Sequence, residues 1–385
     1  MWTSLHASVH RTIRSRHLLK RNQRLLIAVS GGQDSLCLTQ IMLDLQPKWG
    51  WYLGIVHCDH KWRDDSQANA KYVEKLAEKL SIPFYLETAS QPLKSEAAAR
   101  NWRYQVFNAI AFANNYQCII TGHTATDRAE TLLYNLIRGS GADGLQALTW
   151  QRPLLNQIML VRPLLEVTRS QTGKFCQDFQ LQIWLDSTNL DLKYARNRIR
   201  QELLPYLQEK FNPKVESNLA QTAELLQAEV EYLEQAADEL RQKAEVQTNE
   251  PENSFTLLRL NRQVLQKAPL ALQRRAIRQI LQQIMSNAPN FEHIEKLVAL
   301  ITAPNRSQTD PFPGGVIAVV EDEWICLKKI IQLIFNQIQV KTWRSSAYSF
   351  ASLCVKNYIN RVFRTNICKN RINLLKARLL RITDE

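Results

Sequence analysis

Two hydrophobic periods alternate along the first half of the chain. Short runs of aliphatic and β-branched residues predict strands, and between them apolar residues recur at helical spacing. The predicted strands are 25–30, 51–58, 83–88, 117–121 and 158–163. The intervening segment 92–115 has the pattern of a crossover helix. Strands separated by helices predict parallel βαβ units, and so an α/β fold with a doubly wound, mostly parallel sheet.

The pattern changes after residue 213. Apolar residues then recur at spacings of three and four, which predicts one long helix. These residues are Val215, Leu219, Ala223, Leu226, Val230, Leu233, Ala237 and Leu240. Helical patterns return over 255–300, and 311–327 resembles a small hairpin. We expect an α/β domain over 1–213, a connector helix over 214–246, a mainly helical second domain over 247–335 and a basic tail over 336–385.

The amino-terminal segment is basic, with six Arg or Lys and no acid in residues 1–24. An organellar transit peptide is one interpretation. We favour an amphipathic helix that turns Leu5, Val9 and Ile13 toward the core.

Composition narrows the class of protein. With 45% hydrophobic residues and no apolar run near 18 residues, no membrane span is expected. The seven cysteines form no C-x-x-C pair, which indicates reduced core thiols and a cytoplasmic protein. The net charge of +13 favours a polyanionic partner such as nucleic acid.

A glycine-rich loop follows the first predicted strand. Its residues are Ser30, Gly31, Gly32, Gln33, Asp34 and Ser35. Two glycines allow a tight turn with inward N–H groups, and the next helix adds its positive end, so the loop suits a phosphate group. It lacks the spacing and lysine of a Walker loop. Asp34 would repel phosphate unless Mg²⁺ or an amine lay beside it. An ordinary Gly-Gly turn is the alternative.

Two carboxylates share one side of a helix expected to start near residue 126. Asp127 and Glu130 are three residues apart and therefore point the same way. The opposite face is apolar: Ala129, Leu132, Leu133, Leu136 and Ile137. By themselves the two carboxylates could be favourable helix-dipole partners on a solvated face.

Histidines and arginines follow other predicted elements. His57 and His60 flank Asp59, and nucleotide or substrate contacts are a better interpretation than a zinc site. His123 lies on the same edge of the sheet. A further cluster suits phosphate or RNA, although a solvated basic face would look the same. It consists of Arg196, Asn197, Arg198 and Arg200.

These motifs carry a family resemblance. The S-G-G-x-D-S loop resembles that of the N-type ATP pyrophosphatases, which adenylate a carbonyl or amide oxygen and then displace AMP with a nucleophile. Three further segments, in matching order, resemble the tRNA(Ile)-lysidine synthetase family. They are HCDHKWR (57–63), TGHTATDRAETLLYNLIRGSGADGL (121–145) and LDSTNLDLKYARNRIRQELLP (185–205). The chain departs from many relatives at three positions: Trp62, where leucine is commoner, Thr126, where aspartate is common, and Arg128, where glutamine is common. Thr126 could instead be a helix N-cap.

The resemblance implies a PP-loop enzyme that uses ATP and Mg²⁺ to join free L-lysine to the wobble cytidine of isoleucine tRNA with a CAU anticodon. It implies catalytic roles for Asp34, Asp127, Glu130 and Arg196, with Asp34 as the metal ligand. Nucleotide contacts are expected from residues 30–35, His57 and His123. Lysine or tRNA contacts are expected from Asp127, Glu130, Arg100, Arg138, Arg196, Asn197 and Arg200. A cytoplasmic location is expected, and a homodimer is compatible with the sequence.

Two alternatives stay open at this stage. A tRNA thiolase of the same superfamily would deliver sulfur, but the chain offers no C-x-x-C pair. A basic RNA-binding module with an inactive nucleotide loop is the other. Charge clustering also makes Arg274, Arg275 and Arg278 candidates for tRNA contact.

Overall fold

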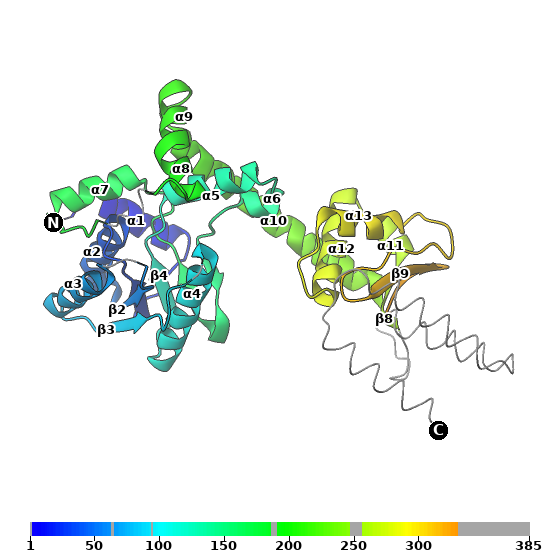
Figure 1. The fold of residues 1–385 in the computed structure, drawn as a ribbon, viewed down its shortest axis with the longest axis horizontal. Helices are drawn as coiled ribbons and strands as arrows, with labels where there is room; N and C mark the ends of the chain where they lie inside the picture. Colours follow the sequence, from blue (N-terminus) through cyan, green and yellow to red (C-terminus); the bar gives the residue numbers. More distant parts are fainter. Residues whose placement is uncertain (1, 63–64, 94, 186–190, 247–255, 330–385) are drawn as a thin grey trace. The chain divides into compact units, whose positions relative to one another are not determined.

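The computed structural model describes residues 2–62, 65–93, 95–185, 191–246 and 256–329. The chain divides into two compact units, residues 1–232 and 233–385 (Figure 1). The four-part division drawn from the sequence stays a prediction, and its tail, 336–385, lies outside the described residues.

A six-stranded sheet forms the centre of the first unit, in the order β3-β2-β1-β4-β6-β5. Its strands are β1 (Arg24–Ala28), β2 (Tyr52–Asp59), β3 (Phe84–Thr88), β4 (Cys118–Thr121), β5 (Gln151–Pro153) and β6 (Met159–Val161). All neighbours pair in parallel except β5, which runs antiparallel to β6 at one edge. The predicted doubly wound sheet is confirmed, whereas β5 was not predicted because three residues carry too little pattern.

Helices cover both faces of this sheet (Figure 1). They are α1 (Ser4–Ser15), α2 (Gln33–Trp49), α3 (Ser66–Lys79), α4 (Glu96–Ala113) and α7 (Arg169–Asp178). Successive strand residues point to opposite faces. Leu25 and Ile27 pack with residues of α1, α2, α3 and α7, and Leu26 packs with residues of α4. Each fully buried aliphatic side chain contributes about 1.5–3 kcal/mol, so the two cores fix the strand order.

The amino-terminal helix is part of the first core, as predicted. Val9 and Ile13 are buried in α1, and Leu5 packs partly buried against the same core. The five cysteines in the described residues are free thiols, four of them buried. No helix in the described part of the chain is long and apolar enough to span a membrane.

Helix α5 (Ala125–Ile137) differs from its prediction in two ways. Its N-cap is Thr124, which forms a capping box with Asp127, so the alternative of an N-cap at Thr126 is wrong. Leu136 and Ile137 were expected on the buried face but are 53% and 68% exposed. The reason is that the apolar partners of α5 pack against Ala129 and Leu133, before its last turn.

Short helices and one long helix complete this unit. They are α6 (Ala142–Leu145), α8 (Ala195–Arg198), the π-helical turn η3 (Ile199–Leu203), α9 (Leu204–Lys210) and α10 (Val215–Ala244). Helix α10 confirms the predicted long helix and runs past residue 232 into the second unit.

The second unit combines helices with a four-stranded antiparallel sheet, β7-β8-β10-β9. Its elements are β7 (Glu245–Val246), β8 (Thr256–Asn261), α11 (Arg262–Gln266), α12 (Leu270–Ile284), α13 (Phe291–Ala299), β9 (Val316–Glu321) and β10 (Trp324–Lys329). The predicted hairpin is β9–β10, a few residues later than expected. The helical pattern expected from 255 was wrong over β8, which pairs with β10 across 60 or more residues of sequence.

A buried ion pair fastens α5 to α10. The Arg128 side chain is 2% exposed, and its Nη1 donates to Glu224 Oε2 at 2.6 Å. Trp150 Nε1 donates to the same oxygen at 2.6 Å, and Arg16 Nη1 donates to Oε1 at 2.5 Å. Glu224 therefore joins three segments of the first unit. This arrangement accounts for the arginine at 128, which faces away from Asp127 and Glu130.

We predict that Glu224→Ala lowers the free energy of unfolding by about 3 kcal/mol, because removing one partner leaves a buried guanidinium without its carboxylate. Glu229→Ala, at an exposed position of the same helix, is the control and should cost less than about 0.5 kcal/mol. Urea unfolding followed by tryptophan fluorescence measures both. Equal losses in the two variants would contradict the prediction.

The same contact predicts a pH dependence. Burial works to raise the pKa of Glu224, but hydrogen bonds from Arg128 and Trp150 lower it below its ordinary 4.5. A depressed carboxyl pKa stabilises the fold above the unfolded pKa, and this contribution is lost as the pH falls through the folded one. The stability difference between the natural chain and Glu224→Gln should therefore shrink as the pH falls from about 5 toward 3. A pH-independent difference in urea midpoints would exclude this origin.

Candidate nucleotide and substrate site

The glycine loop lies where the winding of the sheet reverses. Strands β2 and β4 flank β1, so the loop after β1 and the turn after β4 meet at one crevice, the usual ligand position in such sheets. A Cβ on Gly31, whose φ is +83°, would lie 2.4 Å from Asn69 Oδ1. A Cβ on Gly122 would lie 2.9 Å from the main-chain oxygen of Asp34. Gly31 needs glycine because of its positive φ, and Gly122 needs glycine because the backbone of Asp34 approaches so closely.

The start of α2 forms the floor of this crevice. Gly32 is the N-cap and supplies no capping side chain, so the positive end of the helix is not covered by one. Ser30 and Ser35 hold the loop: Ser30 N donates to Ser35 Oγ at 3.2 Å, and Ser35 Oγ donates to the Gly32 oxygen at 2.8 Å. The cradle fits a phosphate group on this geometry.

Gln33 turns toward α7. Its Nε2 donates to Arg169 O at 2.6 Å and to Thr172 Oγ1 at 2.8 Å. This side chain fastens the loop to α7, and a direct nucleotide contact from it stays a prediction.

Asp34 has two partners that the sequence did not indicate. Thr172 Oγ1 donates to Asp34 Oδ1 at 2.5 Å, and Arg169 Nη1 donates to Oδ2 at 3.1 Å. Burial raises the pKa of Asp34, with Arg169 and Thr172 acting in the opposite direction. The only sequence signal for α7 was the capping box of Thr168 and Gln171, which marks a helix start but not its partner.

The fit of a metal ion can be judged from the donors. Among the residues described, no group of three or more His, Cys, Asp or Glu could hold a metal by itself. Mg²⁺ usually takes one or two carboxylates, with phosphate oxygens and water completing its shell. A single buried carboxylate at the edge of a phosphate cradle fits that pattern.

The two predicted histidines come from the two strands that flank β1: His57 lies on β2, and His123 follows β4 by two residues. His57 is buried, and its Nδ1 is 2.7 Å from the main-chain oxygen of Val29. His123 Nδ1 is 2.9 Å from Thr121 Oγ1. Burial and the Arg162 charge lower the pKa of His123 far below neutrality, so its imidazole is neutral at physiological pH. Contact of either ring with a nucleotide stays a prediction.

Asp127 and Glu130 converge on one guanidinium. Arg200, from η3, donates from Nε to Glu130 Oε1 at 2.5 Å and from Nη2 to Glu130 Oε2 at 2.9 Å. Its Nη2 also lies 3.2 Å from Asp127 Oδ1. We call these three side chains the acidic pair and its arginine. The pair therefore faces a cation and not open solvent.

The acidic pair is asymmetric in its pKa. Burial raises the pKa of Glu130, with Arg200 opposing it. Burial also acts to raise the pKa of Asp127, but His123, Arg200 and the Thr124 hydrogen bonds lower it. Glu130 is only 1% exposed, so its charge depends on a cationic partner.

Three further predicted residues, Arg196, Asn197 and Arg138, contact different parts of the first unit. Arg196 lies beside the site, because its Nη2 donates to Thr131 Oγ1 at 2.7 Å, one turn after the acidic pair begins. Asn197 Nδ2 donates to the main-chain oxygen of Asp191 at 2.8 Å and supports the loop before α8. Arg138 follows the last turn of α5, where its Nη1 donates to Tyr134 Oη at 3.1 Å.

Arg100 belongs to a cluster of buried and partly buried arginines around Tyr104 that the sequence did not reveal. Burial acts to raise the pKa of Tyr104, but Arg162 and Arg100 lower it to about 8. Burial also lowers the pKa of Arg103. The three arginines come from α4 and from the residue after β6, and only the sheet brings them together.

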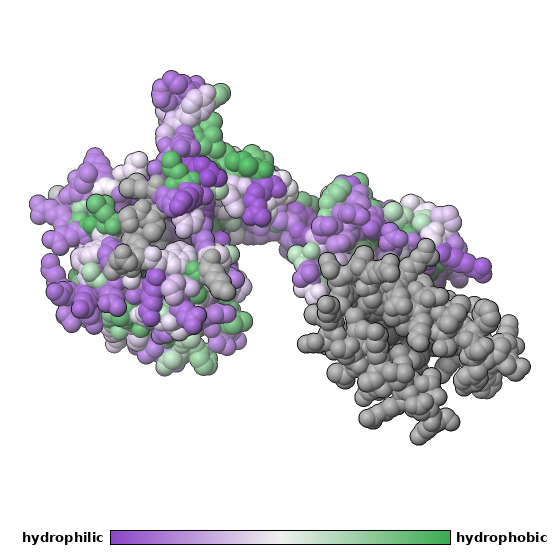
Figure 2. All heavy atoms as spheres, in the orientation of Figure 1, coloured by the Kyte–Doolittle hydropathy of each residue, from purple (hydrophilic) through white to green (hydrophobic). Residues whose placement is uncertain are grey.

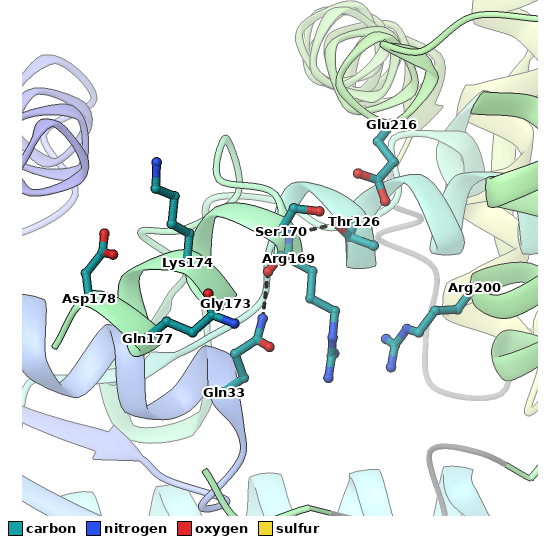
Figure 3. A pocket seen from close by; sticks show the side chains of 10 residues that line it. All are labelled: Gln33, Thr126, Arg169, Ser170, Gly173, Lys174, Gln177, Asp178, Arg200 and Glu216. Carbon is teal, nitrogen blue, oxygen red and sulfur yellow. Dashed lines mark hydrogen bonds between the residues drawn. The ribbon is translucent and has the colours of Figure 1, made fainter. Parts of the chain in front are cut away.

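A pocket of about 670 Å³ is lined by Arg169, the partner of Asp34, and by Arg200, the partner of the acidic pair. Figure 3 shows Arg169 and Arg200 extending into the same space from opposite sides, with Glu216 approaching from α10. Thr126 lines this pocket, where its Oγ1 accepts the Arg169 N–H at 3.0 Å, and Glu216 lines it as well. A carboxylate from α10 thus lies next to the position where many relatives carry aspartate.

The candidate tRNA contacts of the second unit are ion-paired. Arg274 donates to both carboxylate oxygens of Glu295, at 2.7 and 2.9 Å. Arg275 and Arg278 both contact Glu234. Their part in RNA binding stays a prediction.

Comparisons with known families agree with this geometry. The profile of the PP-loop domain matches residues 3–207, and that of the TilS substrate binding domain matches residues 260–323. The first match covers the whole six-stranded sheet.

Curated relatives match most of the chain. A tRNA(Ile)-lysidine synthase of Nostoc sp. is 70% identical over 334 residues, covering 85% of this chain and 98% of that protein. One of Synechocystis sp. is 50% identical over 330 residues, covering 84% and 97%. A chloroplastic tRNA(Ile)-lysidine synthase of Zygnema circumcarinatum is 39% identical over 329 residues, covering 76% and 78%.

A solved structure shares the fold. A U34-tRNA thiolase from Methanococcus maripaludis superposes with a TM-score of 0.50 at 14% identity, covering 58% of this chain and 78% of that chain. Such a likeness shows the PP-loop fold alone. The two matched domains and the extent of the curated relatives show that this chain belongs to the tRNA(Ile)-lysidine synthase family of ATP-binding PP-loop enzymes.

Proposed function

We propose that the chain joins free L-lysine to C2 of the wobble cytidine of isoleucine tRNA with a CAU anticodon, consuming ATP. The observation that carries this proposal is the acidic pair and its arginine, next to the phosphate cradle of residues 30–35. A site that already holds one organic cation between two carboxylates is chemically suited to an ammonium group. The names of the relatives support isoleucine tRNA as the substrate.

The glycine loop and the start of α2 would hold the phosphates of ATP. Main-chain N–H groups and the helix dipole stabilise negative charge there. Mg²⁺ would be held by Asp34 and would offset phosphate charge. Arg169 contacts the same carboxylate, so it would keep Asp34 ionised until the metal arrives.

The reaction would proceed in two steps. O2 of the cytidine attacks the α-phosphorus of ATP, which forms an adenylated tRNA and releases pyrophosphate. The amine of lysine then attacks C2, and AMP leaves with that oxygen. Arg196 and Arg200, which contact Thr131 and Asp127, would stabilise the developing negative charge as fixed cations.

Lysine binding would rearrange the contact made by Arg200. An incoming ammonium and the guanidinium carry the same charge and compete for the acidic pair. We propose that lysine takes over part of this contact and that Arg200 turns toward the phosphate of the intermediate. A cytoplasmic location and a homodimer remain predictions on which this mechanism does not depend.

The direct test is incorporation of labelled lysine into a CAU-anticodon isoleucine tRNA transcript with ATP. Asp34→Ala, Asp127→Ala and Glu130→Ala should each lower kcat/KM by roughly tenfold to 100-fold, as expected for the loss of a charged hydrogen-bonding partner. Glu209→Ala is the control, since this carboxylate is 70% exposed. Full incorporation by all three site variants would refute the site assignment.

The two halves of the reaction should separate by variant. In the absence of lysine, Asp34→Ala should lose tRNA-dependent release of pyrophosphate from ATP, because it alters the phosphate cradle. Asp127→Ala should keep most of this release and fail in lysine transfer, because it alters the amine site. Phosphate detection after pyrophosphatase treatment measures the first half. If both variants lose pyrophosphate release equally, the division of roles is wrong.

The raised pKa of Glu130 predicts a pH-dependent affinity for lysine. Burial raises this pKa above the ordinary 4.5, and only the ionised carboxylate attracts ammonium. The KM for lysine should therefore rise as the pH falls from neutrality toward this raised pKa. Glu130→Gln should have a high KM that no longer changes over that range. If the KM of Glu130→Gln still rose with falling pH as it does in the natural chain, the role of Glu130 would be contradicted.

A further inference from the structure

A second cavity lies beside α5, α8, η3 and α9. It measures about 600 Å³ and runs between the last turn of α5 and the segment α8–η3–α9. Its surface is mainly apolar and aromatic. The apolar lining residues are Tyr134, Ile137, Ala195, Ile199, Leu203 and Tyr206. We call it the α5–α9 groove.

The groove leaves large apolar side chains in contact with solvent. Ile137 is 68% exposed and Tyr206 is 53% exposed. Phe211, which packs edge-on against Tyr206 with ring centroids 5.9 Å apart, is 72% exposed. Figure 2 shows hydrophobic surface around α8 and α9 between hydrophilic side chains. A contiguous apolar surface of this kind with a polar rim marks a binding site more often than a solvated face.

The rim of the groove carries groups that suit RNA. Arg138 lies over the Tyr134 ring at 5.3 Å from its centroid. Arg198 and Glu202 line the same groove. Guanidinium groups attract phosphate, aromatic rings stack on nucleobases, and a carboxylate accepts hydrogen bonds from exocyclic amino groups. Proteins use this combination to hold unstacked bases of single-stranded loops.

The groove and the acidic pair share their supporting helices. Along α5, Tyr134 follows Glu130 by four residues, a rise of about 6 Å. Along η3, Arg200 contacts the acidic pair, whereas the adjacent Ile199 lines the groove. A ligand in the groove would therefore lie at a fixed, short distance from the base that reacts.

We propose that the α5–α9 groove binds an unstacked nucleobase of the anticodon loop next to the wobble cytidine, with its ring against Tyr206 and Ile137 and its phosphate near Arg138. The proposal rests on the proposed function for the presence of the tRNA loop. It assigns to this groove the task of holding the loop open while the cytidine occupies the catalytic crevice. Extruding one base costs stacking energy, and capture of its neighbour would offset part of that cost.

A second copy of this chain is the competing occupant. A stable homodimer buries about 1,200 Å² or more of mostly apolar surface, whereas two guanidiniums and a carboxylate line this narrow groove. The charge pattern thus favours RNA.

The test uses the full chain and kinetics of lysine incorporation with the tRNA transcript. Tyr206→Ala and Ile137→Asp should raise the KM for tRNA about tenfold, as expected for the loss of one base stack or the addition of a repelling charge. The KM values for ATP and lysine should not change. Matched controls are Tyr232→Ala and Leu225→Asp, at positions 72% and 68% exposed on α10, and both should behave like the natural chain.

Substrates that lack one base next to the wobble cytidine make the test specific. The natural chain should lose affinity for one of the two abasic tRNAs, and Tyr206→Ala should lose little more on that tRNA, because both changes remove the same contact. Additive losses on both abasic tRNAs, or equal losses in the α10 controls, would overturn the proposal.

Two further outcomes are distinguishable. If Ile137→Asp dissociates a dimer in native mass measurements and leaves the KM for tRNA unchanged, the groove binds a second copy and the proposal is wrong. If the natural chain incorporates no lysine, the proposed function fails. Direct tRNA binding by the Tyr206 and Tyr232 variants then still decides whether the groove contacts RNA.

Discussion

Pairing of buried charge is the constraint on which the arrangement of the first unit depends. Helix α5 carries charges on two sides, and neither side faces open water. Arg128 meets Glu224 of α10, and Asp127 and Glu130 meet Arg200 of η3. An unpaired ion in such positions would cost several kcal/mol, so the elements that supply the partners cannot move away independently. The helix is thereby held between the glycine loop and the long helix.

The same constraint gives the site its chemistry. A carboxylate that is nearly inaccessible to solvent needs a cation, and a substrate with an ammonium group can supply one. Arg200 pairs with both members of the acidic pair in the free protein. Asp34 is likewise paired with a guanidinium, that of Arg169. Under the proposed function, the same two arginines that pair with these carboxylates in the free protein would also stabilise phosphate charge during the reaction.

Beyond the acidic pair, the surface of α5 is dominated by exposed apolar side chains and not by paired charges. The last turn of α5 extends beyond the apolar side chains that pack against this helix, and Ile137 of this turn lines a groove with α8, η3 and α9. A helix that carries the acidic pair at one end and exposes apolar side chains at the other could hold two parts of one substrate under the proposed function. This arrangement connects the fold to the need of a modifying enzyme to separate adjacent bases of an RNA loop.

The sequence by itself determined what depends on neighbours along the chain. Strand and helix periods predicted the doubly wound sheet, the glycines of residues 31 and 32 predicted the cradle, and the spacing of Asp127 and Glu130 predicted that they point together. Local geometry repeats with a fixed period, so it can be read from spacing.

The tertiary structure alone decided what depends on distant partners. Thr172 reaches Asp34 across 138 residues, and Arg200 reaches Glu130 across 70. It also decided that Thr124 and not Thr126 caps α5, that Arg128 turns away from the site, and that Ile137 is exposed. The hydrophobic period shows which face of an element is buried. It does not show which elements pack against that face or how many turns they cover, because this depends on where those other elements end.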